Sequence, residues 1–209
     1  MDCLKEILVI LRDLVTVIAL PLLLYRVWIM KSTFEQDHTR SRNSKAVDLI
    51  KDWTKSLNSK SSVARKFVEK FDEETCKKLN KQERLQIDYC KENKKFFYSL
   101  FGEKKLVRKH GKIILDSNLV SLLRWEIIMY LNALEGVLVA YRHNVANQKI
   151  IKEQFLYLVS PEEDHYILEK FRKASGIDNY PGIRDFVNEL KLDKAKILTG
   201  EGKTGKLTT

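Results

Sequence analysis

The sequence is poor in the residues that make turns. Its 209 residues include only 8 glycines and 3 prolines. A collagen-like or low-complexity disordered chain needs far more of both, and an all-β sandwich needs a turn every 8–12 residues or so. The scarcity of turn residues therefore favours helices. The length is typical of one domain of ordinary size.

Cysteine is also scarce, with three residues at positions 3, 76 and 90. Three cysteines are too few for a disulfide-stabilised scaffold, and their spacing does not suit a zinc site. The sequence contains no HExxH or GxSxG motif, which are the patterns of zinc proteases and serine hydrolases. We therefore expect no metal, no cofactor and no catalytic residue, and predict that the protein is not an enzyme. Its four histidines are far apart, at His38, His110, His143 and His165.

An apolar segment occupies the N-terminus. Residues 7–28 cover 22 positions, about 33 Å of helix, which matches the hydrocarbon core of a bilayer. Arg12, Asp13 and Arg26 interrupt the segment, and Pro21 is tolerated in a membrane helix. A cleaved signal peptide would need a basic start and a small-residue cleavage site, which are missing here; a buried helix of a soluble domain is the other alternative. We predict that residues 1–30 form a single transmembrane anchor.

Few positive charges precede the apolar segment, and more lie at its C-terminal end and beyond. The latter are Arg26, Lys31, Arg40, Arg42 and Lys45. The positive-inside rule then places the C-terminal domain in the cytoplasm and the short N-terminus outside. The expected location is the plasma (inner) membrane, with a single pass.

The excess of positive charge is local. Residues 31–115 contain 22 Lys and Arg against 12 Asp and Glu, which accounts for the whole formal charge of +10. A dense basic block can bind anionic lipid or an acidic protein, with nucleic acid as a less favoured partner. The alternative is a solvated, lysine-rich surface. The block comprises Lys104, Lys105, Arg108, Lys109 and Lys112.

The rest of the chain has helical periodicity, so we predict an all-α fold in which a single transmembrane helix precedes a cytosolic helical bundle. Residues 31–60 are expected to form a basic juxtamembrane helical connector. Residues 61–192 would form the bundle domain, and residues 193–209 a disordered tail. Two of the expected bundle helices cover residues 85–101 and 161–173.

A long central helix is expected from Asp116 or Ser117 to His143. Its apolar residues cover most of the circumference, which is typical of a helix buried in a bundle. Its polar residues either form a structural network that fixes helix register or bind a small ligand or partner. Gly136 suggests a close crossing by another helix. The candidate binding residues are Arg124, Glu126, Asn132, Glu135, Arg142 and His143.

Part of this helix resembles a family of uncharacterised bacterial and phage proteins that are membrane-anchored and helical. The resemblance rests on residues 124–136, which include Trp125 and Leu131-Asn132-Ala133-Leu134-Glu135, a Trp…Leu-Asn-x-Leu-Glu signature, and on Tyr141-Arg142-His143. It implies a bacterial or phage origin and an inner-membrane location. It implies no catalytic residues.

These observations favour a membrane-anchored, cytosol-facing scaffold that binds partners and has no enzymatic activity. The resemblance alone suggests a role in phage–host conflict, such as phage defence. The alternative is a membrane-disrupting effector, triggered when a ligand or nucleic acid binds the cytosolic domain. Either function is compatible with a homo-oligomer.

Overall fold

The computed structural model describes residues 2–102, 106–160, 165–176 and 179–198, with side chains described from residue 17 to residue 193. The chain divides into two units, residues 1–44 and residues 45–209. We describe each unit by itself.

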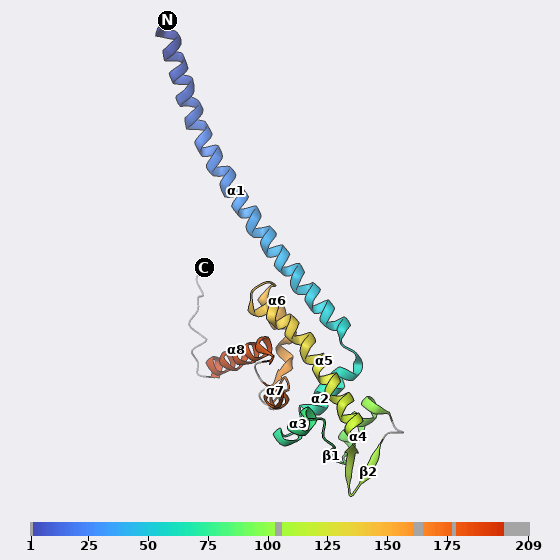
Figure 1. Cartoon of the computed structure of the whole chain (residues 1–209). Helices are drawn as coiled ribbons and strands as arrows, with labels where there is room; N and C mark the ends of the chain where they lie inside the picture. The colour runs from blue at the N-terminus through green and yellow to red at the C-terminus, as the bar shows by residue number, and fades with distance from the viewer. Residues whose placement is uncertain (1, 103–105, 161–164, 177–178, 199–209) are drawn as a thin grey trace. The chain divides into compact units, whose positions relative to one another are not determined.

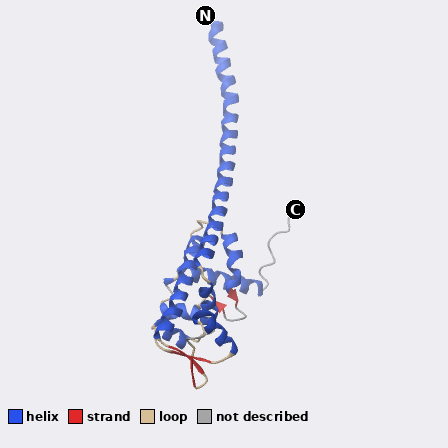
Figure 2. Ribbon diagram, turned by 90° about the vertical axis from the view of Figure 1, so that its right-hand side faces the viewer, coloured by secondary structure: helices blue, strands red, loops and turns tan. Residues whose placement is uncertain are grey.

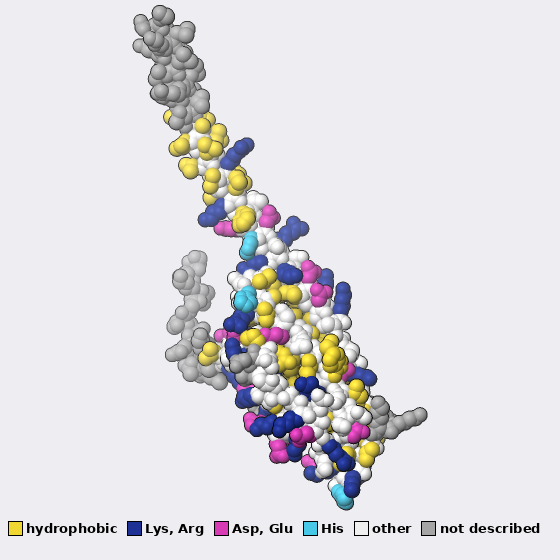
Figure 3. Space-filling view, in the orientation of Figure 1, with side chains coloured by type: hydrophobic (Ala, Val, Ile, Leu, Met, Phe, Trp, Pro, Cys, Tyr) yellow, Lys and Arg dark blue, Asp and Glu magenta, His cyan; other side chains and the backbone are white. Residues whose placement is uncertain are grey.

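The first unit is helical throughout its described length. Helix α1 begins at Asp2 and continues to Ser56, with Pro21 inside it. Between Val17 and Met30 most of its large apolar side chains are exposed, and Trp28 is 66% exposed. Figure 3 shows them as a yellow band on the helix. By length and composition this helix can cross a membrane. An apolar surface of this size is unfavourable in water and favourable in lipid.

The last three turns of α1 belong to the second unit. Ala46 and Trp53 are buried in its core. The Trp53 ring meets Phe155 edge to face at 4.8 Å and Tyr130 at 6.4 Å between centroids. Residues 31–60 were expected to form a separate connector. Instead, residues 31–56 are part of α1, and Ala46 and Trp53 within them are core residues of the second unit.

Helix α5, Ser117–Arg142, is the centre of the second unit (Figure 1). The Asp116 side chain caps it by accepting a hydrogen bond from the Leu119 N–H at 2.9 Å. Ten of its residues are buried, and it packs against α2, α6 and α8. The long helix expected from the sequence is confirmed, with its cap.

The described part of the second unit has six further helices, four of which pack on α5, while one packs on α2 and one on α3. Asn58, Asp72, Cys90 and Asn147 cap four of them through side-chain hydrogen bonds to first-turn N–H groups, as short polar residues commonly do. Pro181 opens the last helix at a position where proline is favoured. The six are α2 (Ser59–Val68), α3 (Glu73–Asn80), α4 (Lys91–Phe101), α6 (Gln148–Phe155), α7 (Glu169–Ser175) and α8 (Pro181–Leu198).

The fold is mostly helical but not all-α, because two small antiparallel sheets join the helices (Figure 2). The larger has the strand order β1-β3-β2, and β3 pairs with both neighbours. His110 and Gly111 form the turn between β2 and β3, both with positive φ, as tight hairpin turns require. The strands are β1 (Leu85–Asp88), β2 (Val107–Lys109) and β3 (Lys112–Leu115).

The expected helix over residues 85–101 is therefore wrong in its first part. Leu85 and Ile87 alternate with exposed Gln86 and Asp88, a period of two that fits a half-buried strand. Four residues are too few for this period to stand out beside the helix that follows. Cys90 then caps α4 by accepting a hydrogen bond from the Asn93 N–H, and Gly102 ends the helix with φ 78°.

Of the expected helix over residues 161–173, residues 161–164 lie outside the described part of the chain, and the residues that follow them form a strand before the helix begins. Val159–Ser160 (β4) pairs with His165–Tyr166 (β5) in a second sheet, and α7 begins only at Glu169. A 3₁₀ turn, Leu156–Leu158, precedes β4. At the C-terminus α8 continues to Leu198, so residues 193–198 of the expected tail are helical. Residues 199–209 lie outside the described part of the chain.

Candidate functional site

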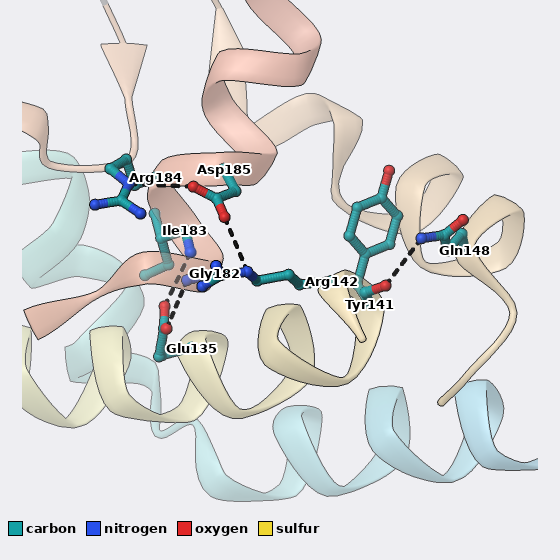
Figure 4. Close-up of polar contacts among 8 residues, drawn as sticks. All are labelled: Glu135, Tyr141, Arg142, Gln148, Gly182, Ile183, Arg184 and Asp185. Atoms are coloured by element: carbon teal, nitrogen blue, oxygen red, sulfur yellow. Dashed lines mark hydrogen bonds and ion pairs between the residues drawn. The ribbon is translucent and has the colours of Figure 1, made fainter. Parts of the chain in front are cut away.

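Glu135 holds the start of α8 (Figure 4). Its two carboxylate oxygens accept hydrogen bonds from the N–H groups of Gly182 at 2.7 Å and Ile183 at 2.9 Å. The first N–H groups of a helix lack partners within that helix, and the helix dipole favours a negative charge at that end. Glu135 therefore caps α8 from another helix, and both of its oxygens are in use.

The close crossing on α5 is at Gly182, not at Gly136. A Cβ atom on Gly182 would lie 2.9 Å from the backbone of Leu138 and Val139. A Cβ on Gly136 would meet nothing within 4 Å. Gly136 is exposed, and the inference that another helix of this chain crosses there is wrong. The glycine that permits the approach belongs to α8, in the same turn that Glu135 caps.

Arg142 adds a second contact between α5 and α8. Its Nε lies 3.0 Å from an Asp185 carboxylate oxygen, and Arg184 contacts the other oxygen at 3.1 Å. Figure 4 shows this group beside the Glu135 cap. Arg142 and Asp185 are each more than one third exposed, so we expect a small contribution to stability.

A third contact between α8 and its neighbours was not foreseen from the sequence. Lys152 of α6 donates to Glu189 and Asp193, both at 2.6 Å, and the Tyr141 hydroxyl donates to Glu189 at 2.6 Å. Burial favours the neutral amine, but the two carboxylates outweigh it and raise the pKa of Lys152. Burial, and then the hydrogen bond to Glu189, raises the pKa of Tyr141. Both groups therefore keep their protons at neutral pH.

Glu126 contacts α2, at a different place. The buried Ser61 hydroxyl lies 2.6 Å from a Glu126 carboxylate oxygen and 3.0 Å from the Asn58 oxygen that caps α2. Glu126, a candidate binding residue, therefore has a partner on another helix of its own chain. By sequence, Ser61 or Ser62 was a candidate cap of the helix that follows the polar run, but the cap of α2 is Asn58, and Ser61 lies inside the helix, in its first turn.

Arg124 contacts α3. Its Nε and one terminal nitrogen both lie 3.4 Å from the Asn80 side-chain oxygen, which is long for a hydrogen bond. The Asn80 amide donates to the Ala174 carbonyl at 3.0 Å. Asn80 thus connects α3 with both α5 and the end of α7.

The six candidate residues of α5 do not converge on one site. Arg124, Glu126 and Glu135 contact three different elements, and Arg142 meets α8 beyond Glu135. Asn132 and His143 are exposed. This arrangement is what a structural network produces, with each polar residue fixing the position of one neighbour.

A buried arginine near the second sheet was missed by the sequence analysis. Arg172 is 1% exposed and donates to the carbonyls of Ile167 at 3.0 Å and Tyr166 at 3.1 Å. Burial lowers the pKa of its guanidinium, and nearby carboxylates oppose that shift. Ile167 and Leu168 both have positive φ, which is unfavourable for branched side chains. Arg172 therefore stabilises a strained turn.

Glu69 fixes the same turn from the other side. It is 7% exposed and accepts a hydrogen bond from the Leu168 N–H at 3.0 Å. Its second oxygen lies 2.9 Å from Arg65. In this turn, Arg172 therefore donates hydrogen bonds to two carbonyls, and Glu69 accepts a hydrogen bond from one N–H. Neither residue stands out in the sequence, because each occupies an ordinary position in a charged helix.

The basic block forms the β2–β3 hairpin. All three residues of β2, including Arg108 and Lys109, are exposed, and Lys112 at the start of β3 is exposed too. The Arg108 guanidinium lies 4.0 Å from the centroid of the Tyr89 ring, within cation–π range. Lys104 and Lys105 lie outside the described residues. The described cations of the block therefore share one exposed hairpin.

Other candidate chemistry finds less support. In the described ranges no three His, Cys, Asp or Glu residues come close enough to hold a metal ion. Burial raises the pKa of the Cys76 thiol to about 12, so this thiol is protonated at neutral pH and a poor nucleophile. A cavity of about 220 Å³ near α2 and α4 has charged walls, but Arg65 pairs there with Glu69 and Lys70 with Glu92.

No family model, no curated protein and no solved structure matches this chain. Its function therefore has to be argued from its own residues.

Proposed function

We propose that this protein is a membrane-anchored, non-enzymatic interaction module whose second unit faces the cytoplasm. The observation that carries the proposal is the exposed apolar surface of α1 between Val17 and Met30. A helix of this kind needs lipid or another protein around it. The positive charges that follow it favour the cytoplasmic side for the second unit. The resemblance noted above would make this membrane a bacterial inner membrane.

The polar residues of α5 support a structural role rather than catalysis. Each of Arg124, Glu126 and Glu135 contacts a side chain or backbone group of its own chain. A catalytic acid or base has to reach a substrate, and these groups are committed to structural contacts. The scaffold they build is rigid, and its most charged projection is the β2–β3 hairpin.

We infer that this hairpin binds anionic lipid head groups. A basic residue close to an anionic membrane surface contributes about 1 kcal/mol. Arg108, Lys109 and Lys112 are exposed together, so the three would contribute about 3 kcal/mol, or more than a hundredfold in affinity. An acidic protein or a nucleic acid would meet the same charges and is distinguished by experiment.

Membrane fractionation tests the anchor. The full chain and a chain beginning at residue 45 are expressed in parallel, and membranes are washed with alkaline carbonate. We expect only the full chain to stay in the membrane pellet. If the full chain is released by the wash, the anchor proposal is wrong. A protease added to the outside of intact cells should spare the second unit.

Vesicle binding tests the hairpin, with the chain beginning at residue 45 so that α1 does not dominate. We expect binding to vesicles that contain phosphatidylserine, weak binding to neutral vesicles, and a decrease with salt. Replacing Arg108, Lys109 and Lys112 by Glu should reduce binding at least a hundredfold. The matched control replaces three other exposed lysines, Lys51, Lys55 and Lys60, and should reduce binding much less.

Equal losses in the two triple variants would mean that only net charge matters, and the hairpin would not be a binding site. Unchanged vesicle binding in the hairpin variant would remove the lipid proposal. Retention of single-stranded or double-stranded nucleic acid by the parent chain, lost in the hairpin variant, would replace it.

A further inference from the structure

Helix α5 has a second stripe that its own chain leaves exposed. The core face of the helix is buried against its neighbours, but eight positions on the opposite face are exposed. We call them the α5 seam. They are Asn118, Leu122, Trp125, Met129, Asn132, Gly136, Val139 and His143.

The spacing of the α5 seam is that of a coiled-coil contact. Successive positions are separated by four and three residues in strict alternation, which is the heptad pattern that keeps one stripe facing a partner helix. Trp125 is 61% exposed, Leu122 is 49% exposed and Met129 is 41% exposed. Figure 3, in the view of Figure 1, shows apolar side chains on the face of the second unit where α5 runs.

The α5 seam contains no Asp, Glu, Lys or Arg. This argues against an anionic lipid surface or a nucleic acid as its occupant, since both are bound by cations. An uncharged helical stripe is best matched by another uncharged helical stripe. In the described part of the second unit the α5 seam is such a stripe, so the α5 seam of a second copy of the chain is a suitable partner.

The sizes of the side chains select an antiparallel arrangement. In the middle of the seam, Leu122, Trp125 and Met129 are large, whereas Asn132, Gly136 and Val139, which follow them, are smaller. In an antiparallel pair centred between Met129 and Asn132, Trp125 faces Gly136 of the partner subunit and Leu122 faces the partner's Val139. In a parallel pair, two tryptophans would share one layer and two glycines another. The first arrangement keeps each layer at a similar volume, which close packing requires.

The charged residues beside the seam allow the same arrangement. In the antiparallel pair Glu126 would face the partner's Ala133, and Glu135 the partner's Ile128. Arg142 would face the partner's Ser121. No like charges oppose each other at these flanking positions, which in coiled coils decide partner and orientation.

We propose that two copies of this protein associate through an antiparallel pair of α5 helices, with Trp125 packed on Gly136 of the partner subunit. Each Gly136 supplies the space that Trp125 fills, and this explains why a glycine with no close neighbour lies inside a long helix. The pair has two-fold symmetry, as most protein dimers do. This inference does not rest on the proposed membrane function.

The contact is small. Helix α5 has 26 residues, which is about 39 Å, and a seam about 10 Å wide buries roughly 800 Å² in total. Stable interfaces bury about 1,200–2,000 Å², so the dimer is reversible and depends on protein concentration. Confinement of both copies to one membrane would raise their effective concentration. The test therefore uses the full chain at its native location.

Disulfide trapping in cells that express the full chain tests the arrangement, whether or not the chain is found in the membrane. Cys3 and Cys90 are first replaced by Ser, while buried Cys76 stays. Two differently tagged chains, one with Leu122→Cys and one with Val139→Cys, are then expressed together and oxidised. We expect crosslinks between the two tagged chains, at least tenfold above those of a Lys95→Cys control at an exposed site of α4. Crosslinking of Leu122→Cys chains to one another would show a parallel pair and overturn the proposal, as would crosslinks no stronger than the control.

Gly136→Leu tests the contact between Trp125 and Gly136. The substitution meets open space within the chain and replaces glycine by a better helix former, so the fold should persist. We expect crosslinking between the two tagged chains to fall at least tenfold. Lys95→Leu, which adds the same side chain at the control site, should leave it unchanged. Undiminished crosslinking in Gly136→Leu would overturn the proposal, and circular dichroism of both variants confirms that each is folded.

Discussion

At the scale of single residues, several buried or half-buried charges of the second unit act on backbone groups. Glu135 accepts hydrogen bonds from two N–H groups of α8, and Glu69 accepts one from the Leu168 N–H. Arg172 donates hydrogen bonds to two carbonyls. A buried backbone group without a partner is costly, so each of these side chains stabilises a turn or a helix end. Their removal should therefore lower stability without touching a ligand.

Replacing Glu135 by Ala tests the cap of α8. Two N–H groups would lose their acceptor, and loss of a helix cap costs about 0.5–2 kcal/mol. Because the lost acceptor is charged, we expect about 2 kcal/mol from urea unfolding of residues 45–209. Glu135→Gln keeps one acceptor oxygen and should lose less. Glu153→Ala, at an exposed position of α6, is the control; equal losses in Glu135→Ala and Glu153→Ala would contradict the capping role.

Replacing Arg172 by Met tests the strained turn. Methionine keeps most of the apolar stem but leaves the carbonyls of Tyr166 and Ile167 without donors. An unsatisfied buried group costs about 1–3 kcal/mol, so we expect a loss of about 2–4 kcal/mol in urea unfolding. Arg84→Met, at an exposed position, removes the same charge from the surface. A similar loss in both variants would show that charge alone, not the turn, is responsible.

The sequence allowed part of this network to be predicted. Glu126 stood out because it lay among apolar residues of a periodic helix, and Asp116 because it preceded one. Arg172, Glu69 and Ser61 did not stand out, because a charged or hydroxyl residue on a polar helix looks the same whether it faces water or a neighbouring turn. Their burial follows from how distant segments pack, which periodicity does not encode.

At the scale of elements, α7 and α8 are held together by charged side chains. Glu169 of α7 lies 3.2 Å from Lys191 of α8 and 3.3 Å from Lys173, and Lys191 lies 3.9 Å from the centroid of the Tyr166 ring. Burial would raise the pKa of Glu169, but the hydrogen bonds from Lys191 and Lys173 outweigh it and lower the pKa below the ordinary 4.5. The stability of the contact between α7 and α8 should therefore depend on pH.

Glu169→Gln measures that dependence. A carboxyl with a lowered folded-state pKa stabilises the fold above its unfolded pKa, and that stabilisation is lost as the pH falls through the folded pKa. The parent protein should therefore be more stable than Glu169→Gln at pH 7, and the difference should shrink below pH 4.5. Urea unfolding at several pH values gives the difference directly. A constant difference from pH 7 down to pH 3 would show that Glu169 acts through packing rather than charge.

The elements themselves were predictable where the signal is long. The 26 residues of α5 and the Asp116 cap follow from periodicity and a capping residue. The four residues of β1 do not, since the strand is determined by its pairing with β3, 24 to 30 residues later in the chain. Ser160 likewise belongs to a strand because it pairs with His165.

At the scale of the whole molecule, the boundary between the units falls inside a helix. Helix α1 is continuous to Ser56, but the second unit begins at Lys45. Composition suggested a connector up to residue 60, because charged residues are frequent throughout that stretch. Ala46 and Trp53 of the same stretch are nevertheless buried in the core of the second unit.

Chains that begin at residues 31, 45 and 57 test this boundary. The first two retain Trp53 and should unfold at the same urea concentration. The third loses a tryptophan that packs on Phe155 and Tyr130, and removal of a buried aromatic side chain costs about 3–5 kcal/mol. That is a large part of the roughly 5–15 kcal/mol by which a domain is stable, so the third chain should unfold at a much lower urea concentration than the other two.

Trp53→Ala in the chain that begins at residue 45 should produce most of the same loss, since it removes the side chain and keeps the helix. If the chain from residue 57 were as stable as the chain from residue 45, the last turns of α1 would belong to the first unit, and the second unit would fold without them.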